Sequence, residues 1–122
     1  MADFNVNSQN FGSFAVIRST GYINNLGGEQ IAKECRELMK SGINGLILNL
    51  RESTVVNSIG ISILIEIIED IIRREGRLAF SDLTPTVAKT FKIMGLLQFA
   101  DLFDSEQDAI NAFNGSNQSE NT

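Results

Sequence analysis

The sequence predicts a single α/β domain built on a mixed β-sheet of about four to five strands, with four helices packed largely on one side. The chain contains short segments that are either apolar throughout or alternate between apolar and polar residues, as is typical of strands. Between them lie longer segments whose apolar residues recur at helical spacing. Strands that alternate with helices form βαβ units with right-handed crossovers. The 122 residues, 43% of them hydrophobic, are enough for one core without a disulfide or a structural metal.

The chain opens with a predicted hairpin. Apolar and polar residues alternate over residues 4–9, as expected of an edge strand, and Gly12-Ser13 marks a turn. Phe14–Arg18 then reads as a second strand that pairs back on the first. Asn24-Asn25 and Gly27-Gly28 predict a loop that leads into a helix.

The first predicted helix is amphipathic. Ile31, Cys35 and Leu38 recur on one face, and Gly42 stands where a left-handed C-terminal cap is expected. Because Cys35 is in register with the apolar stripe, we interpret it as a small core residue and not as a reactive thiol.

The middle of the chain carries the most apolar segments. Gly45–Leu50 is a nearly continuous apolar run, which suits a central strand buried on both faces. A loop over residues 51–57 leads into an Ile-rich helix that runs from Ile59 to about Glu75 and is closed by Gly76. Its core stripe is expected to comprise Ile61, Leu64, Ile65, Ile68, Ile71 and Ile72.

Three further isoleucines, Ile59, Ile63 and Ile67, lie partly outside that stripe. A helix that is apolar around most of its circumference is either deeply buried or partly used in a contact with another protein. The sequence leaves both explanations open.

The last third predicts one more strand and two more helices. Arg77–Ser81 is a short strand, and Thr84-Pro85 opens a helix that stops at Gly95. Ser105–Asp108 resembles a capping box and opens the final helix, which we expect to end near Phe113. Asn114–Thr122 contains no apolar residue and predicts a disordered polar tail.

The residue inventory excludes several classes of function. The chain has no His, which removes imidazole bases and His-bearing metal sites, and its single Cys cannot form a thiolate cluster. No Gly-rich nucleotide fingerprint is present. The sequence therefore predicts no enzyme active site, no metal and no cofactor.

Charge and hydropathy bear on location and partners. A formal net charge of -5 argues against binding to nucleic acid, which requires clustered positive charge. Residues 1–20 lack the apolar run of a signal peptide, and Ile59–Ile72 is too short and too often interrupted by polar residues to span a bilayer. We expect a soluble cytoplasmic protein that does not contact a membrane.

Ser58 is the one candidate for chemistry. It lies where a loop turns into the Ile-rich helix, so it is either a plain helix cap, with Asn57 as its rival, or a site of modification, because a helix N-terminus stabilises a phosphate dianion. Gly60 lowers helix propensity by ~1 kcal/mol relative to Ala. Close approach by another chain would explain the glycine.

Taken together, these segments resemble the STAS domain of bacterial anti-sigma factor antagonists. The resemblance rests on Leu46–Leu50, on Asn57–Ile61, and on Gly76 followed by a strand and then Phe91–Leu96, and it covers residues 3 to about 113. It implies a STAS-like fold over residues 1–113, followed by the polar tail 114–122.

The resemblance also implies a function in the regulation of transcription without catalysis. Members of that family bind an anti-sigma factor that is also a serine kinase, are released once the kinase phosphorylates them, and are reset by a serine phosphatase. On this chain the phosphoacceptor would be Ser58. The partner-binding residues would be Asn24, Asn57, Ile59, Gly60 and Ile63.

This chain departs from the family pattern near Ser58. Asn57 and Asn24 replace two family aspartates, Ile59 replaces a Ser or Thr, and the fold is expected to bring the 21–24 loop close to the 57–60 junction. Fewer negative charges would repel a phosphate on Ser58 less and would hold a basic partner site less well. These departures favour an alternative, a STAS scaffold of the stressosome-like or sensor-associated kind that does not depend on phosphorylation. The sequence leaves a homodimer open.

Overall fold

The computed structural model describes residues 3–118, in which five strands form one mixed sheet in the order β1-β2-β3-β4-β5. The hairpin strands β1 and β2 are antiparallel, and β2, β3, β4 and β5 run parallel to one another. The strands are β1 (Asn5–Asn10), β2 (Phe14–Thr20), β3 (Gly45–Glu52), β4 (Arg77–Ser81) and β5 (Asp101–Phe103).

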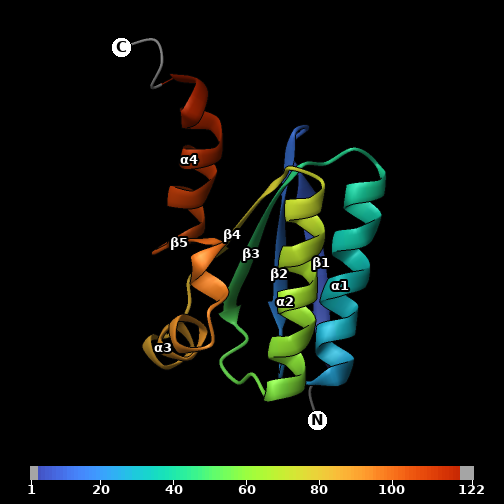
Figure 1. Cartoon of the computed structure of the whole chain (residues 1–122), viewed down its shortest axis with the longest axis vertical. Coiled ribbons are helices and arrows are strands. Elements are labelled where there is room, and N and C mark those ends of the chain that lie inside the picture. The colour runs from blue at the N-terminus through green and yellow to red at the C-terminus, as the bar shows by residue number, and fades with distance from the viewer. Residues whose placement is uncertain (1–2, 119–122) are drawn as a thin grey trace.

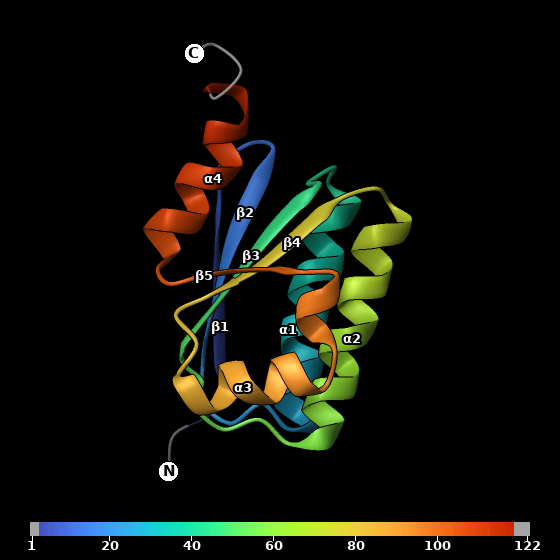
Figure 2. The same ribbon diagram turned by 60° about the vertical axis from the view of Figure 1, so that its left-hand side comes forward.

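Helices cover both faces of this sheet. Figures 1 and 2 show α1 and α2 side by side on one face, α4 on the opposite face, and α3 at the end of the sheet where the helices α1 and α2 begin. The helices are α1 (Asn25–Lys40), α2 (Ser58–Arg73), α3 (Pro85–Ile93), the short 3-10 helix η1 (Leu96–Gln98) and α4 (Glu106–Gln118). The predicted α/β class, with its mixed sheet and four helices, is confirmed.

The two faces differ in how much they bury. The main core lies between the sheet and α1, α2 and α3, where Leu46, Leu48, Leu64 and Phe80 are fully buried. A smaller hydrophobic cluster between the sheet and α4 consists of Phe14, Val16, Ile47, Ala79 and Ala109. Successive residues of β3 point to opposite faces of the sheet, and most of them are buried. The central strand is therefore covered on both faces, as its apolar run predicted.

The bounds of two helices and one additional strand differ from the expectation. Helix α1 begins at Asn25, so Gly27 and Gly28 are helical and do not form a loop. Strand β5 was not predicted, because a segment of three residues is too short to show an alternating pattern. Its backbone pairs with β4, and this pairing makes it a strand. Helix α4 continues to Gln118, past the expected end at Phe113, and the last residues of the expected tail, 119–122, lie outside the described residues.

Side-chain hydrogen bonds connect the first residue of α4, Glu106, to strands β2 and β3. Arg18 of β2 donates two hydrogen bonds to the carboxylate of Glu106, from Nε at 2.9 Å and from Nη2 at 2.7 Å, and Asn49 of β3 donates a third at 2.8 Å. The hydrogen bonds from Arg18 lower the pKa of Glu106, burial acts in the opposite direction, and the bond from Asn49 lowers it further. The network therefore stabilises the ionised form of this carboxyl group.

The stability of the fold should depend on the charge of Glu106. Because its pKa is depressed in the folded protein, the contribution is present above the ordinary Glu value of about 4.3 and is lost as the pH falls through the folded pKa. We expect Glu106→Gln to lower the free energy of unfolding by about 1–2 kcal/mol at neutral pH, and by much less near pH 3. Urea titrations at both pH values measure the difference.

Glu52→Gln is the matched control for that prediction. Glu52 is exposed at the end of β3, and its carboxylate lies 4.0 Å from Arg51, also exposed. Exposed pairs of this kind contribute little, so we expect no measurable change in stability. A loss for Glu106→Gln that is the same at both pH values would contradict the electrostatic explanation.

Candidate functional site

The loops that precede α1 and α2 are joined by backbone hydrogen bonds. The N–H of Ile23 donates to the carbonyl of Val55 at 2.9 Å, and the N–H of Asn57 donates to the carbonyl of Ile23 at 3.1 Å. Ile23 and Val56 form an isolated parallel bridge. The predicted proximity of the 21–24 loop to the 57–60 junction is confirmed, and the two helices start next to each other at the lower end of Figure 1.

An asparagine caps each of these helices. The side chain of Asn24 accepts a hydrogen bond from the N–H of Gly27 at 3.0 Å, and that of Asn57 accepts one from the N–H of Gly60 at 2.8 Å. Asn57 is therefore the cap of α2, and Ser58 is the first residue of the helix. The explanation of Ser58 as a plain cap is wrong, and its rival Asn57 has that role.

The two glycines that face these caps allow the backbone to come close. A Cβ atom added to Gly60 would lie 2.9 Å from the carbonyl carbon of Ile23 and closer still to its oxygen. At Gly27 a Cβ atom would meet the carbonyl oxygen of Tyr22 at 2.5 Å. The chain's own β2–α1 loop makes the close approach at Gly60, so the expectation that another chain makes it is wrong.

Ser58 itself is exposed at the start of α2. Within residues 3–118 the Ser58 hydroxyl makes no hydrogen bond, and the carbonyl oxygen of Ser58 accepts a hydrogen bond from the Ser62 hydroxyl at 3.0 Å. The hydroxyl is therefore accessible to an enzyme that would modify it, and its position beside the N-terminus of α2 suits an added anion.

Four exposed apolar side chains lie on the two joined loops and on the first turns of the helices that follow these loops. We define the Ser58 surface as Ser58 together with Tyr22, Leu26, Val55 and Ile59. Ile59, which the sequence predicted as a contact residue, is 55% exposed. The sequence analysis did not predict exposed contact positions at Tyr22, Leu26 and Val55. The signal that could have identified them is an apolar residue close to a capping Asn, for Tyr22 and Leu26, or inside a predicted loop, for Val55.

Ile63 does not belong to this surface. It is only 6% exposed, because α1 packs over it and its side chain lies against Gly28. Ile67 is also buried. For these two residues deep burial is the correct explanation, and a direct contact of the Ile63 side chain with a partner is not supported by its position. Ile72, expected in the core, is instead exposed.

The single cysteine is part of the core. Cys35 is fully buried, and burial raises the pKa of its thiol, so it remains protonated and unreactive. Its prediction as a core residue is confirmed. Among the described residues, no group of three or more acidic or Cys side chains could hold a metal ion, and no helix is long and apolar enough to cross a membrane.

The cap at Asn57 predicts a graded response to substitution. Asn57→Ala should lower the free energy of unfolding by ~1 kcal/mol, because the N–H of Gly60 loses its acceptor. Asn57→Asp should retain the cap and add a favourable interaction with the helix dipole of about 0.3–1 kcal/mol. Thermal unfolding of the two variants beside the wild type measures both changes, and equal destabilisation by Ala and Asp would contradict the capping role.

The comparisons with known proteins agree with this architecture. The family model described as the STAS domain matches residues 5–109. Three solved structures illustrate the likeness, and at these identities they show a shared fold. The unphosphorylated form of the anti-sigma factor antagonist SpoIIAA is 20% identical, with a TM-score of 0.75 over 91% of this chain and 99% of that one.

The phosphorylated form of SpoIIAA from Bacillus is also 20% identical, with a TM-score of 0.71 over 89% of this chain and 99% of that one. An anti-sigma factor antagonist from Mycobacterium paratuberculosis is 16% identical, with a TM-score of 0.78 over 90% of this chain and 93% of that one. The family model spans most of the chain. The protein belongs to the STAS domain family.

Proposed function

We propose that this protein is an anti-sigma factor antagonist that binds an anti-sigma factor with serine kinase activity and is switched off by phosphorylation of Ser58. The observation that carries the proposal is the exposed Ser58, whose hydroxyl makes no hydrogen bond, at the junction of two paired loops that carry exposed apolar side chains. In this proposal the protein is a cytoplasmic regulator and substrate of the kinase, and it has no catalytic activity of its own.

The physical basis of the switch is the mismatch between a phosphate and an apolar contact. Phosphorylation adds up to two negative charges. In the free protein these charges lie at the N-terminus of α2, where the helix dipole stabilises them. In a complex they would have to be desolvated among Tyr22, Leu26 and Ile59. Phosphorylation therefore weakens the bound state more than the free state, and the partner dissociates.

The two capping asparagines affect the strength of this switch. Asn24 and Asn57 hold the helix starts with neutral amide groups where the family pattern has carboxylates. A phosphate on Ser58 is consequently repelled less by its own protein, and a basic kinase surface gains less from the unphosphorylated form. We expect the discrimination between the two forms to come mainly from the apolar part of the Ser58 surface.

A pull-down from the source cell tests the proposal. Wild-type protein and Ser58→Ala should both retain a kinase-like anti-sigma factor, and Ser58→Asp should lose it. Incubation with that kinase and ATP should add one phosphate-sized mass increment to the wild type and none to Ser58→Ala. A serine phosphatase should remove the increment.

Ser62→Asp is the matched control. Ser62 is exposed one turn further along α2, so the variant carries the same charge on the same helix outside the apolar surface. It should keep the partner. If Ser58→Asp also keeps every partner, or if the kinase phosphorylates Ser58→Ala equally well, the switch is refuted.

A STAS scaffold that works without phosphorylation is the second candidate. It is favoured by the neutral caps Asn24 and Asn57 and by the apolar Ile59 beside Ser58. For a scaffold, wild type and Ser58→Asp should capture the same STAS or sensor proteins, and loss of those proteins in Ile59→Glu would assign the binding to the same surface.

A further inference from the structure

A polar pocket lies where the parallel strands β2, β3 and β4 end. Its volume is about 520 Å³, within the range of cavities that hold a small molecule. In open α/β sheets the carboxyl ends of the strands are the usual place for a ligand. We call this cavity the Asp82 pocket. The charged and amide side chains that line it are Arg18, Asn49, Arg51, Glu52, Asp82 and Glu106.

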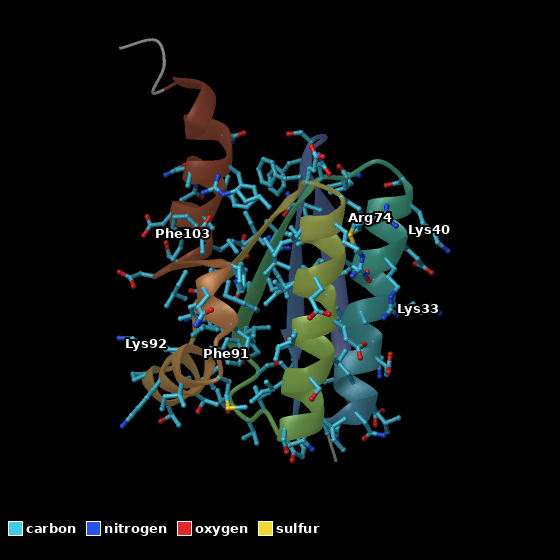
Figure 3. All side chains as sticks on the ribbon, in the orientation of Figure 1. Lys33, Lys40, Arg74, Phe91, Lys92 and Phe103 are labelled. Carbon is cyan, nitrogen blue, oxygen red and sulfur yellow. The ribbon has the colours of Figure 1, made fainter. Side chains whose placement is uncertain are left out.

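The sheet face that leads into this pocket changes from apolar to polar at one level. Three buried apolar residues pair side by side across β2, β3 and β4 under α4, and they are Val16, Ile47 and Ala79. Two residues further along each strand, the next row of the same face is Arg18, Asn49 and Ser81. Phe103 of β5 pairs with Ser81 and packs against the apolar cluster beside α4 (Figure 3). Polar groups on a covered face cost free energy unless they are hydrogen-bonded, so this second row needs partners.

Two oxygen atoms at the end of β4 have no such partner. One is the hydroxyl oxygen of Ser81, whose side chain is fully buried. The other is Oδ2 of Asp82, which is buried although Asp82 lines the pocket. Neither atom makes a hydrogen bond within residues 3–118. Because buried polar atoms nearly always have a partner, a ligand that donates a hydrogen bond at this position would recover free energy that the protein alone does not gain.

The charges around the pocket also leave one carboxylate unmatched. Arg18 is bonded to Glu106 at 2.7 Å, and the exposed Arg51 lies 4.0 Å from the carboxylate of Glu52. Asp82 forms no ion pair with any residue that the structure describes. A carboxylate with a buried oxygen and no counter-ion favours a positively charged ligand.

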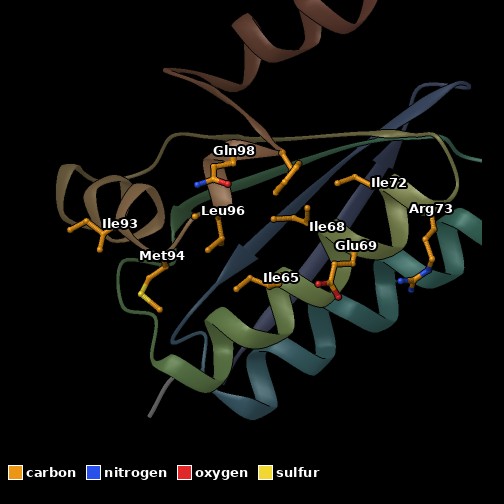
Figure 4. A pocket seen from close by; sticks show the side chains of 11 residues that line it. Ile65, Ile68, Glu69, Ile72, Arg73, Ile93, Met94, Leu96 and Gln98 are labelled. Atoms are coloured by element: carbon orange, nitrogen blue, oxygen red, sulfur yellow. The ribbon is translucent and has the colours of Figure 1, made fainter.

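The remaining lining groups favour a polar ligand. Asn7 and Thr20 are exposed at the pocket, and within the described part of the chain their side chains make no hydrogen bond, so they can bind hydroxyl groups. The groove between α2 and η1, of about 800 Å³, is different, because Ile65 and Ile68 face Met94 and Leu96 there (Figure 4). Its mainly apolar lining offers no comparable set of polar groups.

We propose that the Asp82 pocket binds a small, polar organic molecule that carries an ammonium group. The ammonium group donates a hydrogen bond to Oδ2 of Asp82 and supplies the missing positive charge, and hydroxyl groups of the same molecule bond to Asn7 and Thr20. A divalent metal ion fits less well, since no group of three or more acidic or Cys side chains among the described residues could hold one.

The pocket is separate from the Ser58 surface. It shares no residue with Ser58, Tyr22, Leu26, Val55 and Ile59. The inference therefore does not depend on the proposed phosphorylation switch, and either can fail without the other.

Nuclear magnetic resonance titration of the ¹⁵N-labelled full chain tests the proposal. Glucosamine and ethanolamine, at slightly acidic pH where both are protonated, should shift the amide resonances of Asp82 and Gln107 in a saturable way. N-acetylglucosamine has the same ring without the charge and should bind about tenfold more weakly or less, as expected for the loss of one charge-assisted hydrogen bond. Equal binding of the two sugars, or no saturable shift with either amine, overturns the proposal. Equal or tighter binding of Mg²⁺ at the same resonances would assign the pocket to a metal ion instead.

Asp82→Asn tests the residue that carries the inference. Asn has the same shape and, like Asp, tolerates the left-handed backbone found here, where φ is 60°. The variant should bind glucosamine about tenfold more weakly and should unfold at the same temperature as the wild type or a higher one, because Oδ2 has no partner to lose.

Asp104→Asn is the matched control. Asp104 is exposed close by and does not line the pocket, so the variant removes the same charge and should bind as the wild type does. Unchanged binding by Asp82→Asn, or an equal loss in both variants, overturns the assignment of Asp82. If Asp82→Asn does not fold, the carboxylate has a structural partner and the proposal fails.

Discussion

The variant Gly60→Ala is expected to lower the free energy of unfolding by about 3 kcal/mol, a large part of the stability of a domain of this size. The new methyl group would be forced against the carbonyl group of Ile23. That carbonyl is fixed because it accepts a hydrogen bond from the N–H of Asn57. Backbone atoms held in this way cannot move aside as the end of a flexible side chain could, so the two loops must separate.

Gly115→Ala is the control for this substitution. Gly115 lies in α4, and a Cβ atom added there meets nothing within 4 Å. Ala is the better helix former, so we expect Gly115→Ala to be neutral or more stable by up to ~1 kcal/mol. Urea unfolding followed by circular dichroism measures both variants. An unchanged midpoint for Gly60→Ala would show that the two loops are not held together as described.

The second large effect is expected at the base of α3. This helix buries only Val87 and Phe91, and the ring of Phe91 meets that of Phe80 edge to face, with the centroids 5.0 Å apart. Phe91→Ala should cost about 3–5 kcal/mol, from the lost burial and the cavity that remains. It should also disorder the end of α3 and the residues after it, because Ile93 and Met94 lie two and three residues further along the chain.

Ile93→Ala is the matched control for Phe91→Ala. Ile93 is in the same helix and is mostly exposed, so its truncation should leave the free energy of unfolding within ~0.5 kcal/mol of the wild type. Thermal unfolding of both variants gives the comparison. Similar losses for Phe91→Ala and Ile93→Ala would contradict the assignment of Phe91 as the anchor of α3.

Sequence patterns alone were sufficient for the elements with strong periodicity. The apolar run of Gly45–Leu50, the helical spacing of α2 and the capping residue Thr84 each identified an element that the structure contains. Strand β5 was missed because its three residues have too little sequence for a pattern. The start of α1 was missed because Gly27 and Gly28 are poor helix formers, and their tight packing against Tyr22, Phe4 and Ile63 outweighs that preference.

At the candidate site the sequence identified the position, and the fold determined its surroundings. The repeated pattern Asn-x-x-Gly, at Asn24–Gly27 and at Asn57–Gly60, was visible in the sequence, but its meaning depends on which backbone lies opposite each glycine. Likewise, helical spacing placed Ile59, Ile63 and Ile72 around α2 without saying which of them α1 covers. Whether a residue is buried depends on which elements pack against it, and this cannot be read from the spacing of residues along one helix.

The sequence by itself determined the α/β class and the absence of imidazole chemistry, and it singled out Ser58, because composition, periodicity and capping act within a few residues along the chain. The tertiary structure decided that Asn57 and not Ser58 caps α2, and that Ile63 is buried while Ile59 is exposed. It also decided that the loops before α1 and α2 are paired, with Tyr22, Leu26 and Val55 exposed on or next to them. These properties arise where segments far apart in the sequence meet, since solvent exposure depends on what packs against a residue and not on its neighbours in the chain.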